Sequence, residues 1–372
     1  MWSYRSLRRI DLRIFPILFC LMVISLLVIS SMTGGETHAF WTPLVKSQFR
    51  WYCVGWGVFF FAAGFDYRKL REWSAGLYIL TIILLLGLFF VEPIQHVHRW
   101  YRIFGLMSLQ PSEQAKLAIV ITLSWFLERK GTSVGLPLSA LQTLALVGVP
   151  FLLILKQPDL GTALILFPIA LAMGYFAGVH RYVIRFFTSA GLVGLLFVSL
   201  LFTGVLSHEK MKGPITRVIK EYQYERLNPN TYHQKASQIA IAIGGLTGSG
   251  WHKSEFSGQK WLPAAHTDSV FAAYAEEFGF LGLTFLLLLF CALVYLSFQV
   301  AAVARDSFGR LLAVGLAVYL AMHILANIAM MCALLPISGV PLLFVTYGGS
   351  SLLSAMGALG ILQSVYSKRF MF

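Results

Sequence analysis

Ten long apolar stretches run through the sequence, and they constrain its fold more than any other feature. A helix needs about 20 apolar residues to cross the hydrocarbon core of a bilayer. The gaps between the stretches carry turn residues or charges. We therefore predict an all-α, polytopic integral membrane protein in which residues 1–372 form a single transmembrane domain. The predicted transmembrane helices cover about residues 12–32, 49–65, 74–91, 112–127, 136–155, 161–178, 183–206, 269–299, 311–335 and 348–367.

The composition agrees with a membrane protein. Hydrophobic residues make up 58% of the chain and charged residues 12%, whereas a soluble chain has about 25% charged residues. This argues against a soluble enzyme, a disordered protein and a secreted disulfide scaffold. All 4 cysteines lie inside apolar stretches and no CxxC pair occurs. We therefore expect buried thiols rather than disulfides or a zinc site.

The basic residues indicate how the chain is oriented. The net charge is +13, but no basic run or basic–aromatic patch indicates nucleic-acid binding. Lys and Arg are concentrated at both ends of the chain and in alternate short loops, as is typical of cytoplasmic segments. Both termini are therefore predicted to face the cytoplasm, and one large loop, about 207–268, is predicted to be extracytoplasmic. The first span is longer than the core of a signal peptide, which favours a retained anchor.

The segment from His266 to Ser269 is the most informative candidate site. Asp268 stands at the predicted outer end of the eighth span, and Glu276 follows at i+8. On one helix these carboxylates would share a face about 12 Å apart. Ionisable groups at the edge of a span are costly and by default indicate function. The alternative is that Asp268 only caps the helix N-terminus, where a carboxylate is also favoured.

Two further groups of charged residues are candidates. Glu113 and Lys116 open the fourth span at i and i+3, so we expect them to pair. The pair either holds helices together or lines a polar cavity. Arg99 and Arg102 flank Trp100 just outside the bilayer, which suits an anionic lipid head group. The alternative is an ordinary aromatic residue of the membrane interface.

Irregular segments on the predicted outer side complete the candidate region. From Pro214, apolar residues at helical spacing predict a short amphipathic helix in the interface, with a solvated loop as the alternative. The glycine cluster at 244–250 either approaches a phosphate or is a flexible break. The helix breaks at 157–161 and 336–341 need cover from protein or from a water-filled cavity. We expect them to surround such a cavity.

Taken in order, these segments resemble the SEDS family (shape, elongation, division and sporulation) of bacterial cell-wall polymerases. The resemblance runs from about residue 99 to the end of the chain, and the ten-span topology agrees with it. The compact length and the segment 157–163 look more like the elongation branch (RodA) than the division branch (FtsW). The matching pieces are Arg99-Trp100, Gln110-Pro111-Ser112-Glu113 with Lys116, Gln157-Pro158-Asp159-Leu160-Gly161-Thr162-Ala163, Gly244-Gly245-Leu246, Leu262-Pro263, His266-Thr267-Asp268, Glu276-Glu277 and the stretch from Pro336 to Ser351.

The resemblance implies a peptidoglycan glycosyltransferase that polymerises lipid II on the outer face of the bacterial cytoplasmic membrane. Lipid II is an undecaprenyl-diphosphate-linked disaccharide-peptide. The implied partners are a class B penicillin-binding protein and other elongation or division proteins. A divalent cation, Mg²⁺ or Mn²⁺, is implied with unknown ligands, and no organic cofactor. The family's essential aspartate corresponds to Asp268. The family's functionally important Arg-Trp corresponds to Arg99 and Trp100, and its intramembrane acid–base pair to Glu113 and Lys116. Substrate contacts are expected from these four residues, and separately from Arg102, Gln259 and Glu276.

The sequence departs from the family's pattern at several positions. The aspartate motif usually continues with Phe, where this chain has Ser269. The usual Gly-Lys-Gly after the glycine cluster is Gly248-Ser249-Gly250, so one expected cation is missing. The usual Gly-Ser before Gly-Gly-Leu is Ala242-Ile243. These departures bear on loop details and phosphate contacts more than on the overall activity.

The implied reaction needs one base and several cations. The acceptor's sugar hydroxyl attacks the donor's anomeric carbon, and we expect Asp268 to accept the hydroxyl proton. The departing lipid diphosphate is already a stable anion, so it needs countercharge more than a general acid. Two other functions stay open. One is a lipid-linked precursor transporter (flippase), and the other is a non-catalytic scaffold for the transpeptidase.

Overall fold

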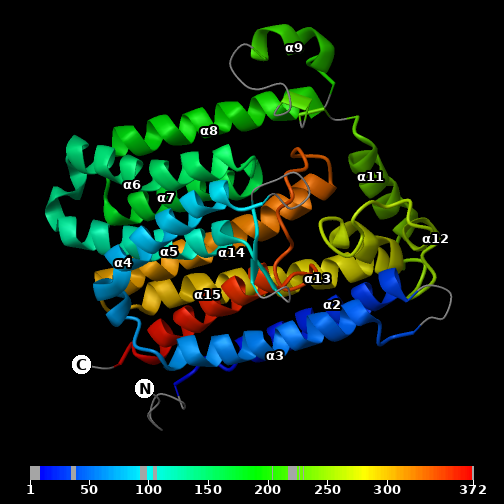
Figure 1. Cartoon of the computed structure of the whole chain (residues 1–372), viewed down its shortest axis with the longest axis horizontal. Helices are drawn as coiled ribbons and strands as arrows, with labels where there is room; N and C mark the ends of the chain where they lie inside the picture. The colour runs from blue at the N-terminus through cyan, green and yellow to red at the C-terminus, as the bar shows by residue number, and fades with distance from the viewer. Residues whose placement is uncertain are drawn as a thin grey trace.

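Ten long helices form the body of the protein. The computed structural model describes residues 9–34, 39–92, 99–103, 107–202, 204–216, 224–225, 227–228 and 230–370. Each predicted span overlaps one of the long helices, which run back and forth through the bundle (Figure 1). Their bounds are α2 (Ile14–Thr33), α3 (Pro43–Gly64), α4 (Lys69–Gly87), α5 (Pro111–Lys130), α6 (Pro137–Lys156), α7 (Leu160–Ala177), α8 (Arg181–Phe202), α13 (Val270–Val303), α14 (Ser307–Met331) and α15 (Gly349–Ser367).

Seven of the described helices are long and apolar enough to cross a membrane, with α4 extended by the 3-10 turn η2 (Leu88–Phe90). The other three long helices, α3, α5 and α15, pack within the same bundle: α3 lies against α15, and α5 lies against α4 and α14. In α5, Glu113 and Lys116 lower the hydropathy. The prediction of an all-helical polytopic membrane protein is confirmed.

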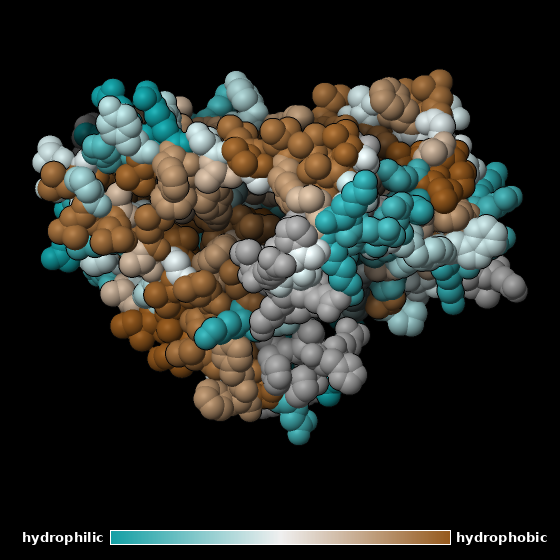
Figure 2. All heavy atoms as spheres, turned by 90° about the horizontal axis from the view of Figure 1, so that it is seen from above, coloured by the Kyte–Doolittle hydropathy of each residue, from teal (hydrophilic) through white to brown (hydrophobic). Residues whose placement is uncertain are grey.

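The outer helices expose apolar side chains. In α8, which packs on α7, Leu201 is the only buried residue. Figure 2 shows hydrophobic residues over much of the face seen from above, as contact with lipid requires. The prediction of buried thiols is wrong: Cys53, Cys291 and Cys332 are exposed and Cys20 is only partly buried, although all four cysteines are free. These helices turn apolar residues outward as well as inward, so an apolar setting does not guarantee burial.

The ends of the bundle differ. The start of α2 and the end of α15 lie together at one end, whereas α11 (Tyr232–Gly244), α12 (Glu255–Gly258) and the start of α13 lie at the other (Figure 1). The short helix α9 (His208–Ile215) precedes them in the loop, and η3 (Gly131–Gly135) joins α5 to α6. Most of the amphipathic helix predicted from Pro214 falls on 217–223, outside the described residues.

A two-stranded antiparallel hairpin interrupts the all-helical pattern. Strands β1 (Tyr101–Ile103) and β2 (Met107–Leu109) pair with Tyr101 opposite Leu109. The sequence does not predict this hairpin, because three-residue strands are too short to show an alternating pattern.

A buried non-helical segment, residues 342–346, lies between α14 and α15. Its backbone groups need partners inside the protein, since no water reaches them. The hydroxyl groups of Ser25 and Tyr52, from α2 and α3, donate to its carbonyl oxygens. The Gln48 amide donates to the Thr346 carbonyl oxygen at 3.4 Å. Protein therefore covers residues 342–346, which follow the predicted break at 336–341.

Candidate functional site

Asp268 lies in the turn immediately before α13, at the end of the bundle opposite the chain ends. The helix begins at Val270, with Ser269 as its N-cap and no side-chain cap hydrogen bond. Two sequence-based interpretations are therefore wrong. Asp268 does not cap α13, and it does not share a helix face with Glu276, because residue 268 still belongs to the turn.

Neighbouring elements fix the Asp268 turn. Nδ2 of Asn327, on α14, donates to the Asp268 carbonyl oxygen at 3.0 Å and to the Val340 carbonyl oxygen at 2.9 Å. The Ser269 N–H donates to the Ala264 carbonyl oxygen at 3.1 Å. These bonds tie the turn to α14 and to the helix break, so the carboxylate stands on a fixed backbone.

The Asp268 carboxylate is partly buried among basic groups. Burial raises the pKa of Asp268 above its usual value, and the charges of His233, Arg99 and His266 oppose this rise. Burial also lowers the pKa of both histidines, with the Asp268 charge acting in the opposite direction. An aspartate with a raised pKa is a stronger base than a free one, and nearby positive charge keeps part of it ionised.

Arg99 connects the site to the start of α7. Its Nε donates to the Gln157 carbonyl oxygen at 3.1 Å, and its Nη2 donates to the Pro158 carbonyl oxygen. The sequence predicts a contact with an anionic head group, but in the structure two backbone carbonyl oxygens accept hydrogen bonds from the guanidinium group. Its charge still acts on Asp268.

Trp100 and Arg102 lie next to Arg99 in the chain but have different exposure. Trp100 is half-buried, and Arg102, on β1, is exposed. No contact in the described part of the chain brings either side chain to Asp268, so their substrate contacts stay predictions.

Asp159 joins two segments that look separate in the sequence. Its buried carboxylate accepts hydrogen bonds from Gln110 Nε2 at 3.0 Å, Ser112 Oγ at 3.2 Å and the Thr162 N–H at 3.4 Å. The helix breaks before α5 and α7 therefore form one unit. The available signal was an aspartate just before an apolar helix, which is typical of an N-cap.

The predicted pair of Glu113 and Lys116 forms inside the bundle. Lys116 Nζ lies 2.6 Å from Glu113 Oε1 and 2.6 Å from Nε2 of His323 on α14. All three side chains are buried. Through His323 the pair joins α5 to α14, as expected if it holds helices together. The sequence does not indicate the contribution of His323.

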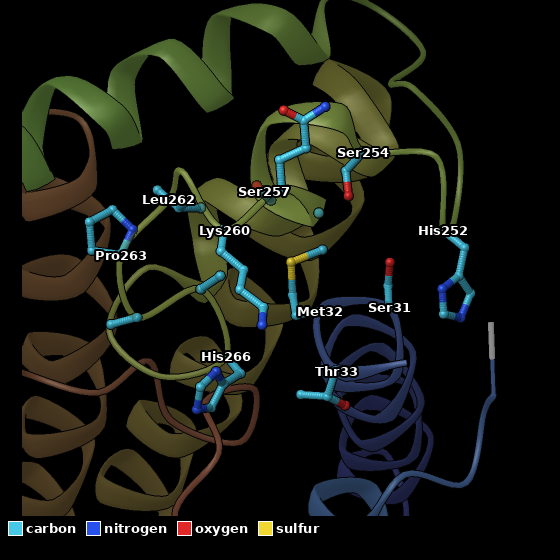
Figure 3. A pocket seen from close by; sticks show the side chains of 14 residues that line it. Ser31, Met32, Thr33, His252, Ser254, Ser257, Lys260, Leu262, Pro263 and His266 are labelled. Atoms are coloured by element: carbon cyan, nitrogen blue, oxygen red, sulfur yellow. The ribbon is translucent and has the colours of Figure 1, made fainter. Parts of the chain in front are cut away.

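A cavity of about 1040 Å³ lies beside the Asp268 turn, between the end of α2 and the loop at 252–266 (Figure 3). The Lys260 side chain extends toward His266. His266 lines the cavity and interacts electrostatically with Asp268, so it connects the two. Lys260 is a cation that the sequence did not single out. The polar side chains of the lining include Thr33, His252, Ser254, Gln259, Lys260 and His266.

Glu276 does not line this cavity, but it holds α12, which forms part of the cavity wall. Its Oε1 accepts from the Phe256 N–H at 2.9 Å, and its Oε2 accepts from the Ser257 N–H at 3.0 Å. The neighbouring Glu277 accepts from the hydroxyl of Ser31 at the end of α2. Glu276 is fully buried and is absent from the cavity lining. These contacts place α12 and give Glu276 a structural role.

The glycine cluster packs against α13. The N–H groups of Ser249 and Gly250 donate to the carbonyl oxygens of Glu276 and Glu277, both at 2.9 Å. Those carbonyl groups lack helical partners because α13 departs from helical geometry at Gly279 (φ 62°, ψ −163°). The phosphate-contact interpretation of these two N–H groups is wrong, since α13 already uses them.

Within the described ranges, no three His, Cys, Asp or Glu side chains converge to hold a metal ion.

Comparison with known proteins supports a relationship over nearly the whole chain. A family profile for cell cycle proteins of the FtsW, RodA and SpoVE group matches residues 8–370. "Peptidoglycan glycosyltransferase MrdB" of Escherichia coli (strain K12) is 32% identical over 363 residues, covering 97% of this chain and 95% of that protein. "Probable peptidoglycan glycosyltransferase FtsW" of Geobacter sulfurreducens (strain ATCC 51573 / DSM 12127 / PCA) is 30% identical over 377 residues, covering 98% and 97%.

Solved structures share the arrangement of helices. The crystal structure of Thermus thermophilus rod shape determining protein RodA matches with a TM-score of 0.68 and 25% identity, covering 98% of each chain. A structure described as "Structural coordination of polymerization and crosslinking by a peptidoglycan synthase complex" matches with a TM-score of 0.78 and 24% identity, covering 98% of this chain and 99% of that one.

Proposed function

This chain belongs to the FtsW, RodA and SpoVE family of cell cycle proteins and is a peptidoglycan glycosyltransferase, and we propose that it polymerises lipid II at the end of the bundle that carries Asp268. One observation carries this proposal. Asp268 stands on a fixed turn beside a polar cavity, with basic groups around its carboxylate.

In the proposed reaction, Asp268 accepts the proton of the acceptor's sugar hydroxyl while that oxygen attacks the donor's anomeric carbon. The bond from this carbon to the diphosphate oxygen breaks, and lipid diphosphate leaves. Burial supports the role of Asp268, because its raised pKa makes it a stronger base. The Asn327 bond to its backbone supports a fixed geometry of attack.

Positive charge around the cavity supports departure of the diphosphate. Lys260 lines the cavity, and Arg99 acts electrostatically on Asp268. Cations placed where negative charge develops stabilise the transition state most effectively when water is excluded. Dependence on a divalent cation stays a prediction. Mg²⁺ commonly binds one or two carboxylates together with substrate phosphates, so it needs no cluster of three protein ligands.

The proposed orientation places this end outside the cell and both termini in the cytoplasm, because the Lys and Arg of the termini and the short loops are concentrated at the other end. The proposed partner is a class B penicillin-binding protein. A structure with the same fold is described as a peptidoglycan synthase complex that coordinates polymerization and crosslinking. The relatives carry the names MrdB and FtsW, so both elongation and division stay open as the cellular role.

The test uses the purified full chain in liposomes with lipid II, with and without the transpeptidase partner. A polymerase forms new glycosidic bonds, seen as a ladder of glycan products on a gel. A flippase moves lipid II across the bilayer and forms no such products. A scaffold gives no product even with the partner present. Loss of product on chelation, with recovery on adding Mg²⁺, would support the divalent cation.

A further inference from the structure

A histidine–serine pair lies directly beside Asp268 and takes no part in the reaction described above. Nε2 of His233, near the start of α11, is 2.6 Å from Oγ of Ser269. Which of the two atoms donates depends on the histidine tautomer. Ser269 is fully buried and follows Asp268 in the chain. The hydrogen bond therefore connects α11 to the residue that follows Asp268, the candidate base.

The His233 ring is held as firmly as the turn that it contacts. α11 packs along α13, and Nε2 of the neighbouring Gln234 donates to the Leu335 carbonyl oxygen at 3.0 Å. The Asp268 charge also opposes the effect of burial on the pKa of His233. Because His233 contacts Ser269, the residue after Asp268, the imidazole lies close to the carboxylate.

The identity of residue 269 fits this contact. The Ser269 hydroxyl can donate or accept a hydrogen bond, so it can pair with either tautomer of the imidazole. With Ser269 bonded to His233 and the Asp268 carbonyl bonded to Asn327, two separate helices fix consecutive residues of the turn.

We propose that His233, held by Ser269, is a positioning residue that fixes the turn carrying Asp268 and keeps the Asp268 carboxylate ionised as the pH falls. The proposal rests on Asp268 being the base. At neutral pH His233 is uncharged, because burial lowers its pKa. As the solution becomes acidic the ring gains a proton, and the resulting cation favours the ionised carboxylate. Arg99 and His266 face the same carboxylate from other segments and stay in place in the variants below.

The experiment compares pH profiles of polymerisation by full-length His233→Ala, Ser269→Ala and the double variant. On the acid limb of the pH profile, activity falls as Asp268 gains a proton. Without the His233 cation this limb moves to higher pH, by about half a unit. Each single variant loses activity at neutral pH by about tenfold. The double variant loses no more than the worse single variant, because both remove one contact. His233→Asn, which keeps a hydrogen-bonding group but no titratable one, recovers neutral activity and not the acid limb.

Ser237→Ala is the matched control. Ser237 is a buried serine on the same helix, and its hydroxyl donates to the His233 carbonyl oxygen within that helix at 3.0 Å. It should keep the wild-type profile. If His233→Ala inserts poorly, two measurements carry the test: the neutral activity of Ser269→Ala and the acid limb of His233→Asn.

Asp268→Asn in the same assay separates the two proposals. Wild-type acid limbs in His233→Ala and His233→Asn, with an inactive Asp268→Asn, would overturn the positioning role alone. An active Asp268→Asn would overturn the base assignment and the positioning role with it.

Discussion

The Glu113 carboxylate and the Lys116 ammonium group meet at 2.6 Å inside the bundle, where both side chains are buried. Lys116 Nζ also lies 5.5 Å from the centre of the Tyr319 ring. Charges removed from water are costly unless they are paired. The i, i+3 spacing predicts the pair, but it cannot predict Tyr319 or His323, which come from α14 and reach Lys116 only in the folded bundle.

Lys116→Met is expected to destabilise the protein strongly, because it leaves the Glu113 carboxylate buried without its cation. The expected loss in the free energy of unfolding is about 3–5 kcal/mol, measured by thermal or denaturant unfolding in detergent. The matched double variant Glu113→Gln/Lys116→Met removes both charges and should lose less. Equal losses in the single and double variants would contradict an ion pair as the stabilising contact.

At the scale of elements, the kink of α13 and the glycine cluster form one structure. Gly248 has φ 80°, and a Cβ atom there would collide with the backbone of Glu277. Gly279, on the other side of the contact, has φ 62° and leaves as little space. Both glycines are required by close approach of two backbones and by a left-handed conformation.

Gly248→Ala is therefore expected to cost about 1–3 kcal/mol of stability and to separate the loop from α13. Gly57→Ala on α3 is the control, since nothing lies within 4 Å of the added Cβ. It should be neutral or slightly stabilising, because alanine favours a helix over glycine. The measurement is the free energy of unfolding of each variant. An unchanged stability in Gly248→Ala would contradict the close packing.

Apolar length predicts the long helices because the bilayer imposes that length. The local sequence pattern fails to predict the structure where contacts with residues distant in the sequence determine it. Spacing alone puts Asp268 and Glu276 on one helix, but Asn327 and Ala264 hold residue 268 in a turn. Pro and Gly likewise predict the helix break after α14, whereas the cover that Ser25, Gln48 and Tyr52 give to the following segment, 342–346, depends on residues near the other end of the chain.

At the scale of the whole molecule, the start of α2 and the end of α15 lie at the end of the bundle opposite the start of α13, which the Asp268 turn precedes (Figure 1). At the end with the termini, Lys368 Nζ lies 3.6 Å from Asp66 Oδ1. Burial lowers the pKa of Lys368, and the Asp66 charge opposes this. The site end carries the cavity and the short loop helices α9, α11 and α12.

The orientation is tested with single cysteines in a background without the four native ones. Lys253→Cys, in the exposed loop near the cavity, should react with a membrane-impermeant maleimide in intact cells. Lys69→Cys, exposed at the start of α4 near the chain ends, should react only after permeabilisation. The reverse labelling pattern would place the site in the cytoplasm.

The most direct measurement of the central claim is the rate of glycan polymerisation by Asp268→Asn at equal membrane insertion. Asparagine keeps the size of the side chain but cannot act as the base. The expected loss is about 10²–10⁴-fold, whereas Asp66→Asn, at the opposite end, should stay close to wild type. Near wild-type polymerisation by Asp268→Asn would contradict a catalytic role for this carboxylate.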